Sequence, residues 1–497
     1  MKRQAVRRYV ARPPFVAAGV WSSIYMLLWA TGQRFSTQYL DIAWQLIPIE
    51  TLREDPIGSV WHLHIQPPLW NLLVGGVLAW SPMPDSISLQ VIQFAFGVLA
   101  VALLASLLAR LFGRPWIGVV LATVTMLDPQ VLAGAFTPTY DLPTTCGLIA
   151  SLWLVVVRPH SPRVTLISLA AIGTAVVMTR TIFHPVWLVL LLGSMWWALR
   201  RSVDRRTVAI TVAIPLVLVG GWMVKNEVLF SRFTLSSWFG MNLQRAVVPV
   251  ATDDQLAVWA AQGHISEITA SYPNGFFLFS GYEPYVGPCV PRHANPAAAN
   301  TTRRGPDAPP NFNAECFLPI YDIAGADARW AIIHHPSLYL EGRWWAMRAW
   351  IGEAPPPLTP TSELYDVMWR AYRVAEVGVP TNIPSVRWAG LPFGALDNPT
   401  HLSAVQAGTT LLVIGAGLRA AWRRVRRRPS SPWIQVEIVA ALIVGWNLVV
   451  GVLFELGEQF RFRATTDPIT ISIGIWLTWR LVGHVRSPRA ALAEPAA

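Results

Sequence analysis

Long apolar runs, separated by short polar or basic segments, set the pattern of this chain. A run of about 20 apolar residues crosses a hydrocarbon core of about 30 Å as a helix. The runs that predict membrane-spanning helices lie at residues 14–30, 87–108, 115–135, 142–157, 163–179, 184–199, 207–224, 405–421, 433–454 and 467–483. A shorter run at residues 67–81 begins with two prolines and makes a marginal span. The pattern predicts an all-α polytopic membrane protein with about 10 to 12 transmembrane segments.

Composition agrees with this pattern. The chain has 497 residues, of which 53% are hydrophobic and 13% are charged, and 25 are tryptophan. Ordinary soluble domains carry about 25% charged residues, so the composition excludes that class. A net charge of +11 raises the question of nucleic acid, but the basic residues lie in short clusters between the apolar runs, as in cytoplasmic loops. We therefore expect contact with the lipid bilayer and no nucleic-acid partner.

The basic clusters also orient the predicted spans. They lie at residues 2–12, 110–114, 158–163, 200–206, 419–428 and 480–489. If all are cytoplasmic, the N-terminus is cytoplasmic and residues 225–404 are exported from the plasma (inner) membrane. Successive loops should alternate between the two sides of the membrane, and counting the spans from the N-terminus places the 110–114 loop outside. Either residues 67–81 do not cross the membrane, or this loop breaks the charge rule. We favour the first explanation, because that run is short.

Three regions follow from this orientation. They are an N-terminal transmembrane module at residues 1–224 with an exported first loop at 31–66, an exported region at 225–404, and C-terminal spans with a cytoplasmic tail at 405–497. The middle region, at about 180 residues, is too long for a simple connector. Cys289 and Cys316 both fall in it. A disulfide between them and two free thiols agree equally well with the sequence.

Polar residues in the first exported loop form the first candidate group. Asp41 lies alone after the first span, and a proline pair at residues 67–68 closes the loop behind His62, His64 and Gln66. A lone loop aspartate is usually only solvated, but its place before this junction makes Asp41 a candidate base. The histidines match no zinc spacing, so a divalent metal is the weaker interpretation and hydrogen bonding is favoured. No cofactor is assigned with certainty.

Two more candidate groups lie at the outer ends of later spans. Tyr140 and Asp141 open one span, where a carboxylate favours a helix N-terminus but also marks a functional hypothesis within a membrane. Arg180 and His184 lie between two others. An exported arginine runs against the charge rule and favours a specific anionic partner, of which a lipid phosphate is the obvious one. An ion pair with a neighbouring carboxylate is the alternative.

The fourth group is the segment ELGEQFRFR at residues 455–463. Arg461 and Arg463 have the spacing of two that is typical of a strand, so both side chains would face one phosphate; with Glu458, a local salt-bridge cluster would have the same sequence. The four groups suit sugar transfer from a lipid phosphate. That reaction needs a carboxylate to deprotonate the acceptor hydroxyl and cations to stabilise the departing phosphate.

In this order, the motifs resemble those of the bacterial GT-C glycosyltransferases related to protein O-mannosyltransferases and to the aminoarabinose transferase that modifies lipid A. The matching features are Asp41, HIQPPL at residues 64–69, Asp141, KNEVLFSRF at 225–233, SSWFGMNL at 236–243, and the Glu458, Arg461, Arg463 set. The resemblance implies a GT-C type helical bundle, a polyprenyl-phosphate sugar donor, an inverting transfer on the exported face and Asp41 as the catalytic carboxylate. Ile42 follows Asp41 where many relatives carry a second acid, and the arginine often found before the second aspartate is absent.

The favoured prediction is a hexosyl- or pentosyltransferase that acts on a cell-envelope glycan, lipid or protein hydroxyl. Two other classes stay open: a lipid or polysaccharide transporter or flippase, for which Glu437 and Asn447 are the main mid-span polar residues, and a non-catalytic envelope-binding relative. The predicted catalytic residues are Asp41, as base, and Asp141. The predicted substrate-binding residues are His62, His64, Gln66, Tyr140, Arg180, His184, Glu458, Arg461 and Arg463.

Overall fold

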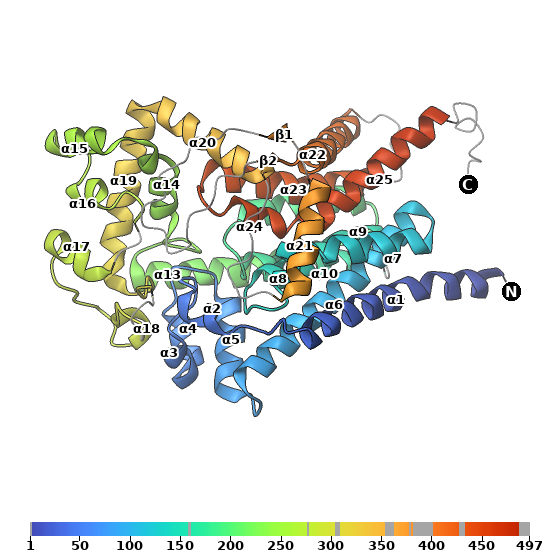
Figure 1. The fold of residues 1–497 in the computed structure, drawn as a ribbon, viewed down its shortest axis with the longest axis horizontal. Helices are drawn as coiled ribbons and strands as arrows, with labels where there is room; N and C mark the ends of the chain where they lie inside the picture. Colours follow the sequence, from blue (N-terminus) through green and yellow to red (C-terminus); the bar gives the residue numbers. More distant parts are fainter. Residues whose placement is uncertain are drawn as a thin grey trace.

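Helices make up nearly all of the regular structure in the computed structural model of this chain (Figure 1). The structure describes residues 2–157, 161–275, 278–303, 309–352, 362–376, 379–380, 401–426 and 433–486. Within these ranges the only strands are β1 (Val379–Pro380) and β2 (His401–Leu402), which pair with each other antiparallel. The predicted all-α class is therefore confirmed.

The apolar runs of the sequence form the long helices of the bundle. These are α1 (Lys2–Ala30), α6 (Asp85–Phe112), α7 (Pro115–Met126), α9 (Asp141–Val157), α10 (Pro162–Val177), α11 (Pro185–Leu199), α12 (Arg205–Pro215) with η1 (Leu216–Gly220) and α13 (Gly221–Phe230), α22 (Ala404–Val425), α23 (Ile434–Leu453) and α25 (Asp467–Arg486). Among the described residues, five segments are long and apolar enough to cross a membrane: 12–30, 85–112, 205–230, 404–425 and 434–453. With the shorter apolar helices beside them, they make the chain a multi-pass membrane protein.

Proline shapes two of the predicted spans. The prediction of one span over residues 115–135 is wrong, because α7 ends at Met126 and a separate α8 (Pro129–Ala133) follows. Pro129 lacks the amide proton that a continuing helix needs, and the Asp128 carboxylate instead caps α8 by accepting from the Gln130 N–H at 2.8 Å. Pro215 leaves its helix unbroken, and the helix passes through the π-helical turn η1.

The first predicted exported loop folds into short helices. They are α2 (Gln38–Ile42), α3 (Ile49–Glu54), α4 (Pro56–Trp61) and α5 (Pro68–Trp80). The 13 residues of α5 rise about 20 Å, less than a hydrocarbon core. Trp70 and Val74 of α5 pack into one apolar core with Leu40 and Trp44 of this loop. That α5 does not cross the membrane stays a prediction.

The region predicted as exported packs onto this first loop. Its helices are α14 (Phe239–Val247), η2 (Val248–Val250), α15 (Asp253–Ala261), α16 (Glu267–Ser271), α17 (Phe279–Val286), α18 (Pro296–Ala299), η3 (Glu315–Phe317), α19 (Leu318–His334), α20 (Pro336–Ile351) and α21 (Glu363–Glu376). Except for α21, they gather at the end of the molecule away from both termini (Figure 1). Trp238 stacks on Trp44 of the first loop at 4.5 Å between ring centroids. Cys289 and Cys316 form a disulfide, which decides between the two alternatives left by the sequence.

Candidate functional site

Four residues from three of the predicted groups meet in one place, which we call the Asp141 cluster: Asp141, Arg180, Glu458 and Arg461. Arg461 donates from Nε to Asp141 Oδ2 at 3.0 Å and from Nη1 to Glu458 Oε2 at 3.2 Å. Arg180 Nη1 lies 2.6 Å from Asp141 Oδ1, an ion pair without hydrogen-bond alignment. Two guanidinium groups therefore share one carboxylate.

Elements far apart in the sequence carry these side chains. Asp141 opens α9, Arg180 lies in the turn between α10 and α11, and Arg461 lies on α24 (Gln459–Ala464). Thr145 on α9 donates from Oγ1 to the Thr465 carbonyl at the end of α24, at 3.1 Å. This bond fixes α24 beside α9, so that Arg461 reaches the carboxylate at the N-terminus of α9.

A glycine makes the approach of α24 feasible. Gly457 has a φ of 122°, a backbone conformation that is accessible to glycine but strained for other residues. It lies directly before Glu458, the residue that precedes α24. The chain thereby turns from the end of α23 into α24 within a few residues.

The first loop lies against the same turns. The Ser36 N–H donates to the Phe136 carbonyl, ahead of α9, at 2.9 Å. The Leu69 N–H, directly after the proline pair, donates to the Met178 carbonyl, ahead of α11, also at 2.9 Å. Both ends of the first loop are thus fixed to the segments that carry the Asp141 cluster.

Aromatic rings flank the two guanidinium groups. The Tyr140 ring centroid lies 5.2 Å from Arg180 Cζ and 5.0 Å from Arg461 Cζ, and the Phe462 ring lies 5.0 Å from Arg180 Cζ. At these distances the negative face of a ring attracts a cation. Tyr140, predicted from sequence as a binding residue, is therefore part of the cluster wall.

Two first-loop residues that the sequence did not single out also reach the cluster. Burial raises the pKa of the Tyr39 hydroxyl, and Arg461 is close enough to oppose that rise. The Gln45 side-chain oxygen, in the amide orientation that satisfies its neighbours, accepts from Arg461 Nη1 at 3.2 Å and from Trp44 Nε1 at 2.9 Å. Tyr39 lies two residues before Asp41 in the candidate loop, and this position could have identified it as a site residue. The sequence around Gln45 offered none.

Guanidinium donors exceed the acceptors in this cluster. Arg180 is 2% exposed, and among the described residues neither its Nε nor its Nη2 has a hydrogen-bond partner. The same is true of Arg461 Nη2. Burial by itself would lower the pKa of Arg461, but Asp141 and its neighbours outweigh burial and hold that pKa well above its usual value. The cluster therefore offers charged, buried donors of the geometry that binds phosphate oxygens.

Asp41 lies on α2 but outside this cluster. Residues two apart on a helix point about 200° apart, so the partly buried Tyr39 and the exposed Asp41 occupy different faces of α2. The Asp41 carbonyl accepts from Arg303 Nη1 at 3.4 Å, and the second Arg303 nitrogen donates to the Leu46 carbonyl. Arg303 thus fixes the chain on both sides of the α2 C-terminus. Within the described ranges, no hydrogen bond or ion pair joins the Asp41 carboxylate to the cluster.

The three polar residues before the proline pair lie elsewhere. His64 is fully buried; its Nδ1 lies 2.7 Å from Ser237 Oγ and its backbone N–H donates to Asn313 Oδ1 at 2.8 Å. His62 Nδ1 donates to the Gly58 carbonyl at 2.7 Å, and Gln66 is buried. Among the described residues, no three His, Cys, Asp or Glu side chains are grouped as metal ligands. That a divalent metal is the weaker interpretation stays a prediction.

The last two predicted residues have structural partners. His184 is exposed and caps α11 by accepting the Val186 N–H on Nδ1 at 3.3 Å. Arg463 is buried, pairs with Asp467 at 3.1 Å, and donates from Nη1 to the carbonyls of Trp350 at 2.9 Å and Gly352 at 2.7 Å.

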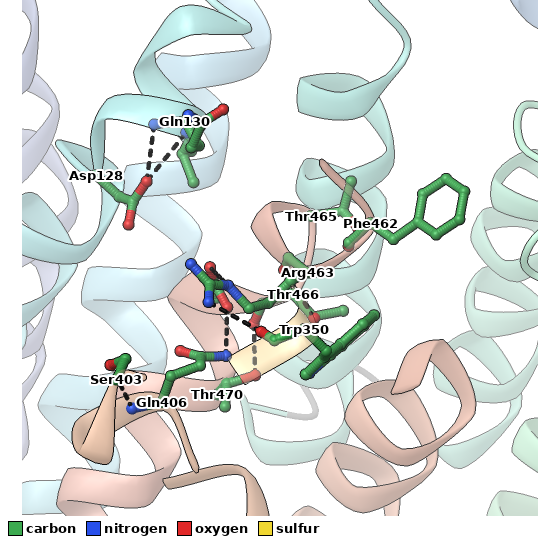
Figure 2. Close-up of polar contacts among 12 residues, drawn as sticks. Asp128, Gln130, Trp350, Ser403, Gln406, Phe462, Arg463, Thr465, Thr466 and Thr470 are labelled. Atoms are coloured by element: carbon green, nitrogen blue, oxygen red, sulfur yellow. Dashed lines mark hydrogen bonds and ion pairs between the residues drawn. The ribbon is translucent and has the colours of Figure 1, made fainter. Parts of the chain in front are cut away.

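The strand-like interpretation of residues 461–463 is wrong, because α24 is a helix. Residues two apart on a helix point in opposite directions, so Arg461 and Arg463 cannot both face one phosphate. Figure 2 shows the Arg463 side chain on the side of Gln406 and Ser403, with the Phe462 ring pointing away from it.

No protein-family model matches this chain, and no curated protein matches it by sequence. Three solved structures are similar. They are the archaeal oligosaccharyltransferase AglB from Archaeoglobus fulgidus in complex with an inhibitory peptide and a dolichol-phosphate (12% identity, TM-score 0.41, 99% of this chain and 53% of that chain), the Archaeoglobus fulgidus oligosaccharyltransferase in the apo form (12%, 0.40, 98% and 52%), and ArnT from Cupriavidus metallidurans bound to undecaprenyl phosphate (14%, 0.32, 96% and 80%). The chain spans about half the length of the archaeal oligosaccharyltransferase.

Proposed function

We propose that this chain is a GT-C type membrane glycosyltransferase that transfers a hexosyl or pentosyl group from a polyprenyl phosphate to a hydroxyl of the cell envelope. One observation carries the proposal. Arg180, which is buried, and Arg461, which is partly buried, share the Asp141 carboxylate, and both keep buried guanidinium nitrogens without partners among the described residues. The ordered sequence motifs, found independently, support the same function.

In this proposal the arginines act on the leaving group. The bond between the anomeric carbon and the phosphate oxygen breaks, and its electron pair stays on the phosphate. Arg180 and Arg461 stabilise the charge that develops there. Asp141 and Glu458 hold the two guanidinium groups in place, so little reorganisation is needed during the reaction. Asp141 is then a positioning residue, because both of its oxygens face the arginines.

Asp41 would be the base that takes the proton of the acceptor hydroxyl as the new glycosidic bond forms on the opposite face of the sugar. Its carboxylate is exposed, and it belongs to the same short helix as Tyr39. That position leaves the carboxylate open to an acceptor, on the short helix whose Tyr39 reaches the cluster. Inversion of the anomeric centre follows from attack opposite the phosphate.

The proposal places the first loop and the middle region outside the plasma membrane, with the N-terminus in the cytoplasm. The disulfide between Cys289 and Cys316 supports this orientation, because disulfides persist in oxidising compartments and are rare in the cytosol. The basic clusters between the apolar helices support it as well.

The test uses membranes that contain the full chain and a radiolabelled polyprenyl-phosphate sugar, with envelope material as acceptor. Asp41→Asn should lower transfer by about 10²- to 10⁴-fold, as expected for loss of a general base. Glu54→Gln is the matched control, because Glu54 is another exposed carboxylate of the first loop, and it should transfer within about twofold of the parent. Transfer by Asp41→Asn and Asp41→Ala at the parental rate would overturn the role of Asp41.

A further inference from the structure

A second basic site lies between the C-terminal helices, remote from the Asp141 cluster. A cavity of about 560 Å³ opens between α22, α23 and α25. Its apolar wall includes Leu411, Leu412, Gly415, Leu477 and Leu481, and its polar residues are Arg419, Arg423, Glu437 and Arg480. We call this cavity the α22 groove.

The α22 groove is at the opposite end of these helices from the proposed reaction. Glu437 lies in the first turn of α23, whereas the segment with Glu455 and Glu458 follows the last turn. Sixteen residues of helix separate Glu437 from Leu453, a rise of about 24 Å. Arg424, next to the groove, donates to the Trp197 carbonyl at the end of α11 at 3.5 Å. The groove therefore lies at the end of the bundle that carries the basic clusters.

The charges in the groove are unbalanced. Arg480 and Glu437 pair with each other at 2.6 Å. Arg419 and Arg423 lie one turn apart on α22 and are both exposed. Within the described part of the chain, neither side chain takes part in an ion pair or hydrogen bond. Three arginines against one glutamate leave the groove cationic.

The position of α22 in the membrane indicates which kind of anion can enter this groove. α22 and α23 are both long and apolar enough to span a membrane. The exposed Leu411 and Leu481 of the groove therefore face the bilayer, while Arg419 and Arg423 lie in the last two turns of α22. A phospholipid has the same division, with a charged phosphate at the surface and apolar chains below it. Basic pockets between transmembrane helices bind anionic head groups in this way.

We propose that the α22 groove binds an anionic phospholipid, with the phosphate at Arg419 and Arg423 and one acyl chain along Leu411, Leu412 and Gly415. This site goes beyond the proposed transfer reaction and does not depend on it. Bound there, the lipid would contact all three C-terminal helices at once and hold them together at this end.

Two pairs of variants separate the head group from the chain. Arg419→Gln with Arg423→Gln removes the head-group contacts; Arg201→Gln with Arg426→Gln is its control, since both of those arginines are exposed and do not line the groove. Gly415→Leu fills the acyl track, because a Cβ at Gly415 meets no atom within 4 Å. Gly408→Leu is the control for that change: it has the same free space on the same helix, outside the groove.

The measurement is native mass spectrometry of the full chain, released from nanodiscs that contain phosphatidylglycerol and phosphatidylcholine with identical acyl chains. We expect the parent to retain phosphatidylglycerol over phosphatidylcholine. The double arginine variant should retain about tenfold less phosphatidylglycerol, Gly415→Leu at least threefold less by this steric block, and both controls should match the parent.

Each other outcome overturns the proposal. Equal retention of the two lipids would show that head-group charge is not recognised. Parental retention in the double arginine variant would place the lipid elsewhere. If inorganic phosphate displaces phosphatidylglycerol and Gly415→Leu binds as the parent does, the groove is a site for a free anion and not for a lipid.

Discussion

Arg461 and Arg463 lie two residues apart on one short helix, yet they belong to two different kinds of cluster. Arg463 is buried between Asp467 and the backbone carbonyls of Trp350 and Gly352, and none of its buried nitrogens lacks a partner among the described residues. Arg461 pairs with Glu458, shares the Asp141 carboxylate with Arg180 and keeps an unpartnered nitrogen. A buried cation with every donor satisfied stabilises a fold. A cation that keeps hydrogen-bond donors without partners can bind a ligand without first breaking other contacts.

The largest effect on stability should come from Arg463→Gln. The change leaves Asp467 buried with Gln406 as its remaining side-chain partner, at 2.8 Å, and loss of one member of a buried ion pair costs about 3–5 kcal/mol. We expect a clearly lower midpoint of thermal unfolding in detergent. The same substitution at Arg461 is the matched control and should cost much less, because the Asp141 carboxylate keeps Arg180. Equal loss in the two variants would remove the distinction between the clusters.

The next effect is on transfer. Arg180→Gln and Arg461→Gln should each lower the rate by about 10²- to 10³-fold, the usual cost of removing one donor that stabilises developing charge. Unfolding midpoints should stay close to that of the parent. If either variant transfers normally, the guanidinium group concerned does not contact the leaving phosphate.

The sequence predicted the helices, but not the different surroundings of Arg461 and Arg463. Apolar runs predicted the helices correctly because length and hydropathy are local properties, and the wrong prediction at residues 115–135 came from underestimating Pro129 and its cap. Asp141, Arg180 and Arg461 were each selected for being charged beside a span. These three residues meet because of the way α9, α11 and α24 pack, and a local sequence pattern does not predict that packing.

The sequence could not separate Arg461 from Arg463 either. Alternate spacing predicts a shared face on a strand and opposite faces on a helix, and six residues are too few to choose between the two by periodicity. Gln45 was missed for a related reason: it reaches the cluster only because both ends of the first loop are fixed against the turns before α9 and α11.

A smaller effect should appear in ligand protection. A polyprenyl phosphate at about 100 times its dissociation constant stabilises the state that binds it by about 2.7 kcal/mol. We expect a rise of a few degrees in the unfolding midpoint of the parent, and no rise when Arg180 and Arg461 are both changed to Gln. The groove variant with Arg419→Gln and Arg423→Gln should keep the rise. Loss of protection there would assign this ligand to the groove.

The smallest effect concerns His64. It tests whether a buried nitrogen without a partner indicates a ligand site even when the side chain carries no charge. His64 Nε2 has no partner among the described residues, but burial, helped by nearby Lys225, lowers the pKa of this ring from 6.5 to about 3, so the ring is neutral and is no spare cation.

Between pH 6.5 and 3 the unfolded chain binds a proton that the folded chain does not, so His64 should make stability fall as the pH falls through that window. From pH 7 to pH 5 the loss is about 2 kcal/mol at most. His64→Asn, which can keep the hydrogen bond to Ser237, should flatten this part of the profile of unfolding midpoint against pH, while transfer at pH 7 stays near the parental rate. Parallel pH profiles for parent and variant, together with a loss of transfer at pH 7, would instead make His64 a ligand-binding residue. A buried nitrogen without a partner would then indicate a ligand site whether or not the side chain is charged.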